Sequence, residues 1–312
     1  MGGIIFGPVR SRRFGESLGV DLSPYVKQCN YDCLYCELEG KKAQDSMESP
    51  LEVETILREI QKGLAHFPNI ESLTITANGE PTLYPYLYEL MLRLEDVKGA
   101  TQTLLLTNGS LLCEPSIARA CLLFDKVKFS LDALSKEVFK KIDRPSKTIN
   151  LEQVLHGIYD FSADFMGELY AEILFVKSIN DSLEEVKKMA KFLAPMRLKR
   201  LDIGTIDRPP AYKVERISEK QLESLGRIFL DFGIPTFVAK RIESNRQENL
   251  ILTQEEILKT LAMRPQSLQD ISTLWHSSTK KILQELLQSG AVERIESNGE
   301  EFFRIPYDNK IQ

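Results

Sequence analysis

The sequence predicts an α/β protein: a partial or complete parallel (βα) barrel plus a small, winged-helix-like C-terminal domain. Two observations lead to this expectation. Short apolar, β-rich runs alternate with amphipathic segments as far as residue 238, and strand–helix–strand crossovers imply a parallel sheet. Near residues 245–252 the character of the chain changes. We therefore expect a barrel domain over residues 1–245 and a second domain over residues 250–312.

The strands and helices of the barrel are expected to alternate along the chain, and in such folds functional residues gather on the loops after the carboxyl ends of the strands. The expected strands are Leu18–Leu22, Ser72–Ala77, Thr103–Thr107, Lys126–Leu131, Leu169–Val176, Leu201–Ile206 and Pro235–Val238. The expected helices are Leu51–His66, Tyr84–Leu94, Pro115–Leu123, Leu151–Phe161, Ser182–Leu193 and Ser218–Phe232.

The second domain combines helix signals with a hairpin signal. Thr253 and Ser267 are good N-caps, Gly290 is a good C-cap, and Asn298-Gly299 is a hairpin turn pair. Three helices and a hairpin in this order resemble a winged helix. From Leu250 onward, seven Lys or Arg stand against nine Asp or Glu, which makes a poor binder of duplex DNA. The expected elements are helices Gln254–Met263, Leu268–Leu274 and Ser278–Gln288, then strands Val292–Glu296 and Glu301–Ile305.

Composition limits the class of protein. The 312 residues are 43% hydrophobic and 27% charged, with a formal charge of -5, which does not favour a protein that coats nucleic acid by charge alone. No apolar run approaches the roughly 18 residues that span a bilayer, and residues 1–13 show no apolar leader pattern. We expect a cytoplasmic protein without a membrane partner.

Three of the five cysteines lie close together, as Cys29-Asn-Tyr-Asp-Cys33-Leu-Tyr-Cys36, directly after the first expected strand. In a reducing compartment such a group is more typical of metal binding than of disulfides. Three thiolates can hold a [4Fe-4S] cluster and leave its fourth iron without a protein ligand, open to a small molecule. The alternatives are a zinc site without an obvious fourth ligand, or buried structural cysteines.

The C-x3-C-x2-C spacing, with Tyr35 before the last cysteine, resembles the motif of radical S-adenosylmethionine (SAM) enzymes. Three further motifs follow in the order of that family: Asn78-Gly79-Glu80-Pro81, Thr107-Asn108-Gly109 and Ser130-Leu131-Asp132-Ala133. Each lies at the end of an expected strand. Asn78 stands where the family has its first glycine. The resemblance covers about residues 15–240 and implies a barrel of the radical SAM type.

The resemblance also implies roles. One [4Fe-4S] cluster, held by Cys29, Cys33 and Cys36, would bind S-adenosyl-L-methionine and cleave it reductively, and the resulting 5'-deoxyadenosyl radical would abstract hydrogen from a substrate. A flavodoxin or ferredoxin-type electron donor is implied. The expected cofactor-binding residues are Gly79 and Glu80 near the methionine amino group, Ser130 and Asp132 near the ribose hydroxyls, and Tyr35 near the adenine, together with Asn78 and Asn108.

The substrate is less well specified. The segment from Phe6 to Gly15 and the segment Asp207-Arg-Pro-Pro-Ala look similar to a bacterial and archaeal group related to the wybutosine-synthesis radical enzymes of tRNA. Modification of RNA, tRNA first, is one hypothesis; a peptide or protein substrate is the second, and a redox-responsive metal-binding regulator is the third. Basic residues that could hold phosphates are Arg10, Arg12, Arg13, Arg197, Lys199, Arg200, Arg208, Lys213 and Arg216, with solvated charge or internal ion pairs as the alternative.

Overall fold

The computed structural model describes residues 3–11, 15–239, 250–263 and 265–306. Its main feature is an eight-stranded sheet in which the strands follow one another in chain order. β1 (Ile5–Ser11) and β2 (Gly15–Asp21) pair antiparallel, and every later neighbour pairs parallel. The parallel strands are β3 (Ser72–Thr76), β4 (Gln102–Thr107), β5 (Lys126–Ser130), β6 (Glu168–Phe175), β7 (Leu198–Thr205) and β8 (Thr236–Val238).

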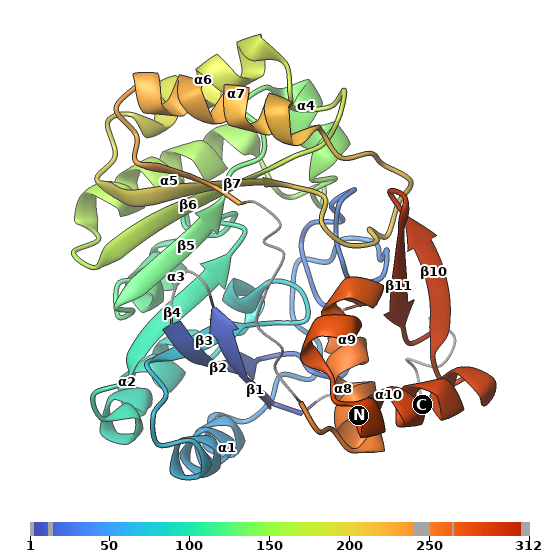
Figure 1. Ribbon diagram of the computed structural model, residues 1–312. Helices are drawn as coiled ribbons and strands as arrows, with labels where there is room; N and C mark the ends of the chain where they lie inside the picture. The colour runs from blue at the N-terminus through green and yellow to red at the C-terminus, as the bar shows by residue number, and fades with distance from the viewer. Residues whose placement is uncertain (1–2, 12–14, 240–249, 264, 307–312) are drawn as a thin grey trace.

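The sheet is an open, partial barrel, because no pairing joins β1 to β8 among the described residues. This confirms the α/β class and the partial form of the expected barrel. Figure 1 shows the helices on the outer face of the curved sheet. They are α1 (Val53–His66), α2 (Leu87–Lys98), α3 (Pro115–Cys121), α4 (Lys136–Ile142), α5 (Leu151–Asp164), α6 (Leu183–Leu193) and α7 (Glu219–Asp231).

The face of the sheet that the helices cover is apolar, and the sequence explains why. Alternate residues of the strands, such as Val127, Phe129 and Ile173, belong to one large apolar cluster with the inner faces of the helices. The opposite face carries polar groups that pair between strands, for example Lys128, whose Nζ lies 2.6 Å from Glu172 Oε1 on the next strand. The concave face is therefore the polar one.

Among the elements longer than three residues, two were not expected. β1 precedes the first expected strand, and α4 lies in a segment left without an assignment. Helix ends otherwise follow their local signals: Asn150, Ser182 and Ser218 each accept a backbone N–H in the first turn of their helix. The described part of the chain contains no helix long and apolar enough to span a membrane.

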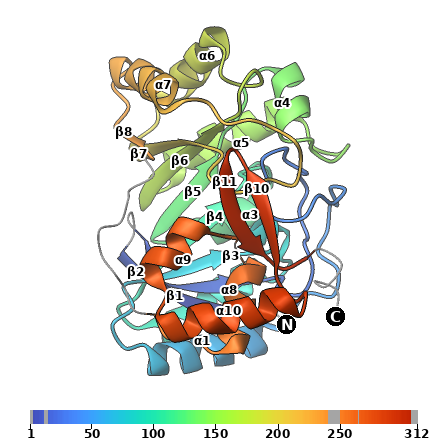
Figure 2. The same ribbon diagram turned by 45° about the vertical axis from the view of Figure 1, so that its right-hand side comes forward.

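Residues 250–306 form a smaller unit with its own apolar cluster, which includes Trp275. Its helices are α8 (Gln254–Met263), α9 (Leu268–Leu274) and α10 (Ser277–Gln288). Its sheet has the order β10 (Glu293–Ser297), β11 (Glu300–Arg304), β9 (Gln266–Ser267). Ser267 and Asp270 make the reciprocal capping box at the start of α9. Figure 2 shows this unit in front of the concave side, with the β10–β11 hairpin rising along it.

Candidate functional site

The loop Cys29–Cys36 follows β2 and lies against the loop after β3. Gln28 N donates to Asn78 O at 2.8 Å, and Glu80 N donates to Gln28 O at 2.9 Å. Gly79 has φ +136°, and a Cβ built on it would lie 1.8 Å from Gln28 O. The contact requires glycine there, because any side chain would push the two loops apart.

A second segment, residues 142–146, holds the other side of the cysteine loop. Leu34 N donates to Ile142 O at 2.8 Å, Asp32 N donates to Asp143 O at 3.0 Å, and Ser146 N donates to Asn30 O at 2.9 Å. The carboxyl end of α4 supplies the first of these carbonyls. These bonds satisfy backbone groups that an irregular, partly buried loop would otherwise leave unpaired.

The loop after β7 is the third segment that contacts the cysteine loop. Ala211 N donates to Cys36 O at 2.8 Å, and the Tyr212 hydroxyl donates to the Asp32 carboxylate, 2.7 Å from Oδ2. The Arg144 guanidinium lies 3.2 Å from the same Asp32 oxygen and 4.3 Å from the centre of the Tyr212 ring. Arg144 therefore holds the loop in place through an internal ion pair.

The three thiols are free and lie in different surroundings. Tyr31 N lies 3.4 Å from Cys29 Sγ, Asp143 Oδ1 lies 3.6 Å from Cys33 Sγ, and Lys27 Nζ lies 3.4 Å from Cys36 Sγ. Burial raises the pKa of Cys29 to about 12 and that of Cys33 well above its ordinary value. Such thiols are poor nucleophiles by themselves, and a bound metal would have to displace their protons.

The donor set fits a cubane cluster. Among the described residues, no three His, Cys, Asp or Glu side chains converge closely enough to share one metal ion. In a [4Fe-4S] cluster each cysteine binds its own iron, so the thiols surround the cluster rather than meet at a point. The N–H groups directed at Cys29 and Cys36 suit thiolate ligands, since hydrogen bonds to sulfur stabilise the ionised form.

Glu80 is buried and fully engaged by the protein. Its Oε1 accepts from Thr82 N and from the hydroxyls of Thr82 and Thr107, and its Oε2 accepts from Asn108 N at 2.7 Å. Burial raises its pKa, and the hydrogen bonds from Thr107 and Thr82 oppose that shift. The Glu80 side chain thus ties the loop after β3 to the end of β4.

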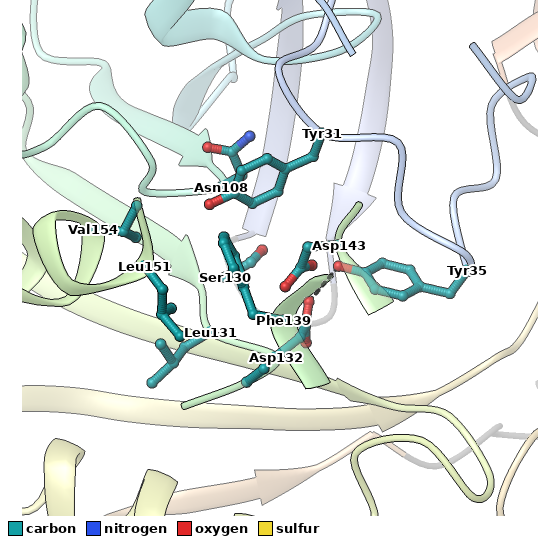
Figure 3. A pocket seen from close by; sticks show the side chains of 11 residues that line it. Tyr31, Tyr35, Asn108, Ser130, Leu131, Asp132, Phe139, Asp143, Leu151 and Val154 are labelled. Carbon is teal, nitrogen blue, oxygen red and sulfur yellow. Dashed lines mark hydrogen bonds between the residues drawn. The ribbon is translucent and has the colours of Figure 1, made fainter. Parts of the chain in front are cut away.

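A pocket opens between the cysteine loop and the ends of β4 and β5 (Figure 3). Asp132 Oδ1 accepts from Leu174 N at 2.7 Å, and Oδ2 accepts from the Tyr35 hydroxyl. Burial raises the pKa of Asp132 to about 7, and the Tyr35 hydrogen bond limits the rise. The lining residues are Tyr31, Tyr35, Asn108, Ser130, Leu131, Asp132, Ala133, Phe139, Asp143, Leu151 and Val154.

The structure brings together Tyr35, Asn108, Ser130 and Asp132, which all line this pocket. The other three expected cofactor-binding residues lie on the loop after β3 and make other contacts. Asn78 O accepts from Gln28 N just before the cysteine loop, Gly79 packs closely against the Gln28 carbonyl, and the Glu80 side chain joins its own loop to the end of β4. None of these three is among the lining residues.

Sequence reasoning missed Tyr31, Asp143 and Lys27. Asp143 lies in the pocket beside Asp132, and burial followed by the charge of Asp132 raises its pKa well above the ordinary value. Burial alone would lower the pKa of Lys27, but its interactions with Cys36 and other neighbours raise it overall. For two of these residues the position in the sequence could have indicated a place in the site, since Tyr31 lies inside the cysteine motif and Lys27 lies two residues before it.

The basic residues considered for phosphate binding are largely paired inside the chain. Arg10 has a described backbone only, and Arg12 and Arg13 lie outside the described residues. In the second group four of six make ion pairs, namely Lys199 with Glu168 (3.0 Å), Arg200 with Asp202 (2.7 Å), Arg208 with Asp270 (3.4 Å) and Arg216 with Glu300 (3.6 Å). For these four, internal ion pairing is the observed state.

The chain has clear relatives. A family model described as the Radical SAM superfamily matches residues 23–193. A UPF0026 protein of Helicobacter pylori (strain ATCC 700392 / 26695) is 43% identical over 286 residues, which is 91% of this chain and 92% of that protein. A UPF0026 protein of Methanocaldococcus jannaschii is 30% identical over 321 residues, covering 96% of this chain and 95% of the relative.

The fold has solved counterparts. The structure of Streptococcus suis SuiB bound to S-adenosylmethionine matches with a TM-score of 0.54 and 16% identity, over 69% of this chain and 48% of that chain. At this identity the likeness concerns the fold alone.

Proposed function

Because this chain belongs to the radical SAM superfamily, and within it to the UPF0026 family, we propose that it generates its radical in the pocket between the cysteine loop and the ends of β4 and β5. Members are enzymes that use a [4Fe-4S] cluster and S-adenosyl-L-methionine. When bound, the reduced cluster supplies the electron that cleaves S-adenosylmethionine to methionine and a 5'-deoxyadenosyl radical. The observation that carries the proposal is the convergence of motifs from three strand ends on one loop with three cysteines.

In this proposal Cys29, Cys33 and Cys36 are the three protein ligands of the cluster. Their N–H neighbours and the enclosure of their loop support the assignment. A flavodoxin or ferredoxin-type protein is the electron donor that such chemistry needs.

The cofactor contacts follow from the pocket. Ser130 and Asp132 are the proposed partners of the ribose hydroxyls, and Tyr35, which lines the same pocket, is the proposed neighbour of the adenine. The two hydrogen bonds that Asp132 already accepts leave lone pairs for a diol. Asn108 lines the same pocket. The backbone of Asn78, Gly79 and Glu80 is the proposed neighbour of the methionine amino group, with the Glu80 side chain as a positioning residue.

The decisive test is formation of 5'-deoxyadenosine. The protein is purified anaerobically, loaded with iron and sulfide, reduced with dithionite and incubated with S-adenosylmethionine beside a Cys33→Ala control. Product in the wild type and none in the control supports the proposal. A fully loaded wild type that forms no product, with or without cell extract as a source of substrate, contradicts it.

For the substrate, we favour the second hypothesis over the first. An RNA substrate needs cations that can contact phosphates, and four of the nine basic residues considered for this role are paired with carboxylates. The C-terminal unit, which we propose is a winged-helix domain, carries more acidic than basic residues. We therefore propose a peptide or protein substrate, with tRNA as the second candidate.

A deletion strain separates the two candidates. It is complemented either with the wild-type gene or with the Cys33→Ala variant, and both tRNA nucleosides and tryptic peptides are compared by mass spectrometry. A peptide whose mass depends on the wild-type gene, with unchanged nucleosides, supports a protein substrate. A nucleoside that depends on the wild-type gene, with unchanged peptides, favours tRNA and contradicts our choice.

A further inference from the structure

Lys27 is a buried lysine beside a proposed cluster ligand. Its side chain is enclosed, with the whole residue 2% exposed. Its Nζ lies 3.4 Å from Cys36 Sγ and 2.7 Å from Glu39 O. No motif that the sequence offered includes this residue.

The charge of Lys27 lacks an ordinary counter-ion. No carboxylate lies within ion-pair distance of its Nζ in the described part of the chain, whereas Lys128, also buried, has Glu172 at 2.6 Å and Asp202 at 3.3 Å. An ammonium group taken out of water without an anionic partner costs several kcal/mol. The sulfur of Cys36, 3.4 Å from Nζ, is therefore the potential anion that Lys27 contacts directly, and as a cluster ligand it would be a thiolate.

We infer that Lys27 places a fixed positive charge and an N–H donor on the Cys36 ligand, and thereby makes the cluster easier to reduce. The inference rests on the proposed function. The reduced cluster carries one more negative charge than the oxidised cluster, so a nearby cation stabilises the reduced form more. Charge and hydrogen bonds to the sulfurs are established determinants of iron–sulfur potentials.

A purely structural role is the competing explanation, because Lys27 is also part of the loop's framework. Its Nζ bonds Glu39 O, and its own carbonyl accepts from Lys41 Nζ at 2.9 Å. The two roles differ in what they predict for the reduction equilibrium. A structural tie requires a donor of suitable length, whereas stabilisation of the reduced cluster requires the charge.

The test is the midpoint potential of the loaded protein, followed by the EPR signal of the reduced cluster during an anaerobic titration. Lys27→Met removes charge and donor, Lys27→Gln keeps a donor without charge, and Lys27→Arg keeps both. Lys42→Met, an exposed lysine on the same loop, controls for net charge. We expect the Met and Gln variants to shift the reduction equilibrium at least about tenfold toward the oxidised form, equivalent to about 59 mV for one electron. We expect the Arg and Lys42 variants to stay within about threefold of the wild type.

Each result decides one question. If Lys27→Met and Lys27→Gln keep the wild-type potential, Lys27 is structural and the inference is wrong. If Lys27→Met fails to hold a cluster, the potentials of the Gln and Arg variants decide: a shift in Lys27→Gln that Lys27→Arg does not share supports the role of the charge, while wild-type potentials in both variants, or no cluster in either, overturn the inference. A wild type that holds no EPR-active cluster refutes the proposed function instead.

Discussion

Asp21, at the end of β2, is a buried carboxylate that organises two loops of the site. Its Oδ1 accepts from Ser23 N at 2.9 Å and from Asn78 N at 2.8 Å. Burial raises its pKa from 3.8 to about 6, and the two backbone hydrogen bonds only partly offset this. The folded protein therefore binds the Asp21 proton more tightly than the unfolded chain does, and stability falls as pH rises from about 4 to about 6.

We predict that Asp21→Asn stabilises the protein at neutral pH. An amide oxygen can accept the same two bonds without the cost of burying a charge, which is about 3 kcal/mol above pH 6 by linkage. Urea unfolding of both proteins from pH 4 to pH 8 measures the difference in free energy. It should be near zero at pH 4 and reach its maximum above pH 6; a difference independent of pH would contradict the assignment.

Burial raises the pKa of Asp132, and the hydrogen bond from the Tyr35 hydroxyl opposes this rise. Loss of this hydrogen bond in Tyr35→Phe should raise the Asp132 pKa above about 7. If ionised Asp132 binds the ribose, the affinity for S-adenosylmethionine should increase with pH in both proteins, with a higher midpoint in the variant. Calorimetric titrations between pH 6 and pH 8.5 test this. Equal midpoints in the two proteins would show that Tyr35 does not affect the ionisation of the group on which S-adenosylmethionine binding depends.

At the residue scale, the sequence identified the site residues that belong to short motifs. It missed the residues that only tertiary packing brings to the site. Tyr35, Asn108, Ser130 and Asp132 lie at or after the carboxyl ends of predicted strands, and parallel strand ends meet at one edge of the sheet. Asp143 could not be identified because it belongs to an unexpected helix end. For Glu80 the motif predicted the position but not the orientation of the side chain, which depends on the Thr107 hydroxyl of β4.

At the element scale, the missed elements have local explanations. β1 includes Gly7 and Pro8, and its pairing with β2 is irregular between Phe6 and Val9. Such residues are tolerated at the edge of a sheet but weaken a strand signal. α4 has only seven residues, too few for a clear helical period. The longer helices and the central strands were predictable because their apolar positions repeat regularly.

The close contact between Gly79, in the loop after β3, and the Gln28 carbonyl can be tested by substitution. In Gly79→Ala the new Cβ would overlap the Gln28 carbonyl and the residue would keep φ +136° only under strain. We expect a loss of more than about 3 kcal/mol in unfolding free energy, or a displaced cysteine loop. Gly99→Ala is the matched control, since a Cβ there meets nothing within 4 Å although φ is also positive. Unfolding curves and iron content of the two variants should differ clearly; equal losses would show that backbone strain alone is responsible.

At the scale of the whole molecule, the loop after β7 connects two parts of the chain that the sequence treats as separate. Arg208 on this loop donates to Pro265 O and pairs with Asp270 of α9, while Ala211 and Tyr212 hold the cysteine loop. Composition and helix signals predicted the two regions. The contact between them joins residues 57 and 62 positions apart, and no local pattern encodes it.

We predict that Arg208→Met loosens both neighbours of this loop. Removal of a buried guanidinium leaves the Pro265 carbonyl without this donor, at a cost of about 1–3 kcal/mol. Hydrogen exchange should increase in Gln266–Leu274 and also in Cys29–Cys36. Arg197→Met, at an exposed position before β7, is the control. Faster exchange in α9 alone would show that the C-terminal unit is held independently of the cysteine loop.

The enclosure of Cys29–Cys36 has a consequence for the order in which the protein matures. The ribosome makes the three cysteines early, but their backbone partners lie at residues 142–146 and at Ala211, and the loop with Ala211 is itself held by residues beyond 264. The thiols of the nascent chain therefore lack these contacts until residues 142–146 and 211 have been made. We consequently expect iron and sulfide to be delivered after synthesis of the barrel, and a truncated chain would present the proposed ligands without the contacts that enclose them.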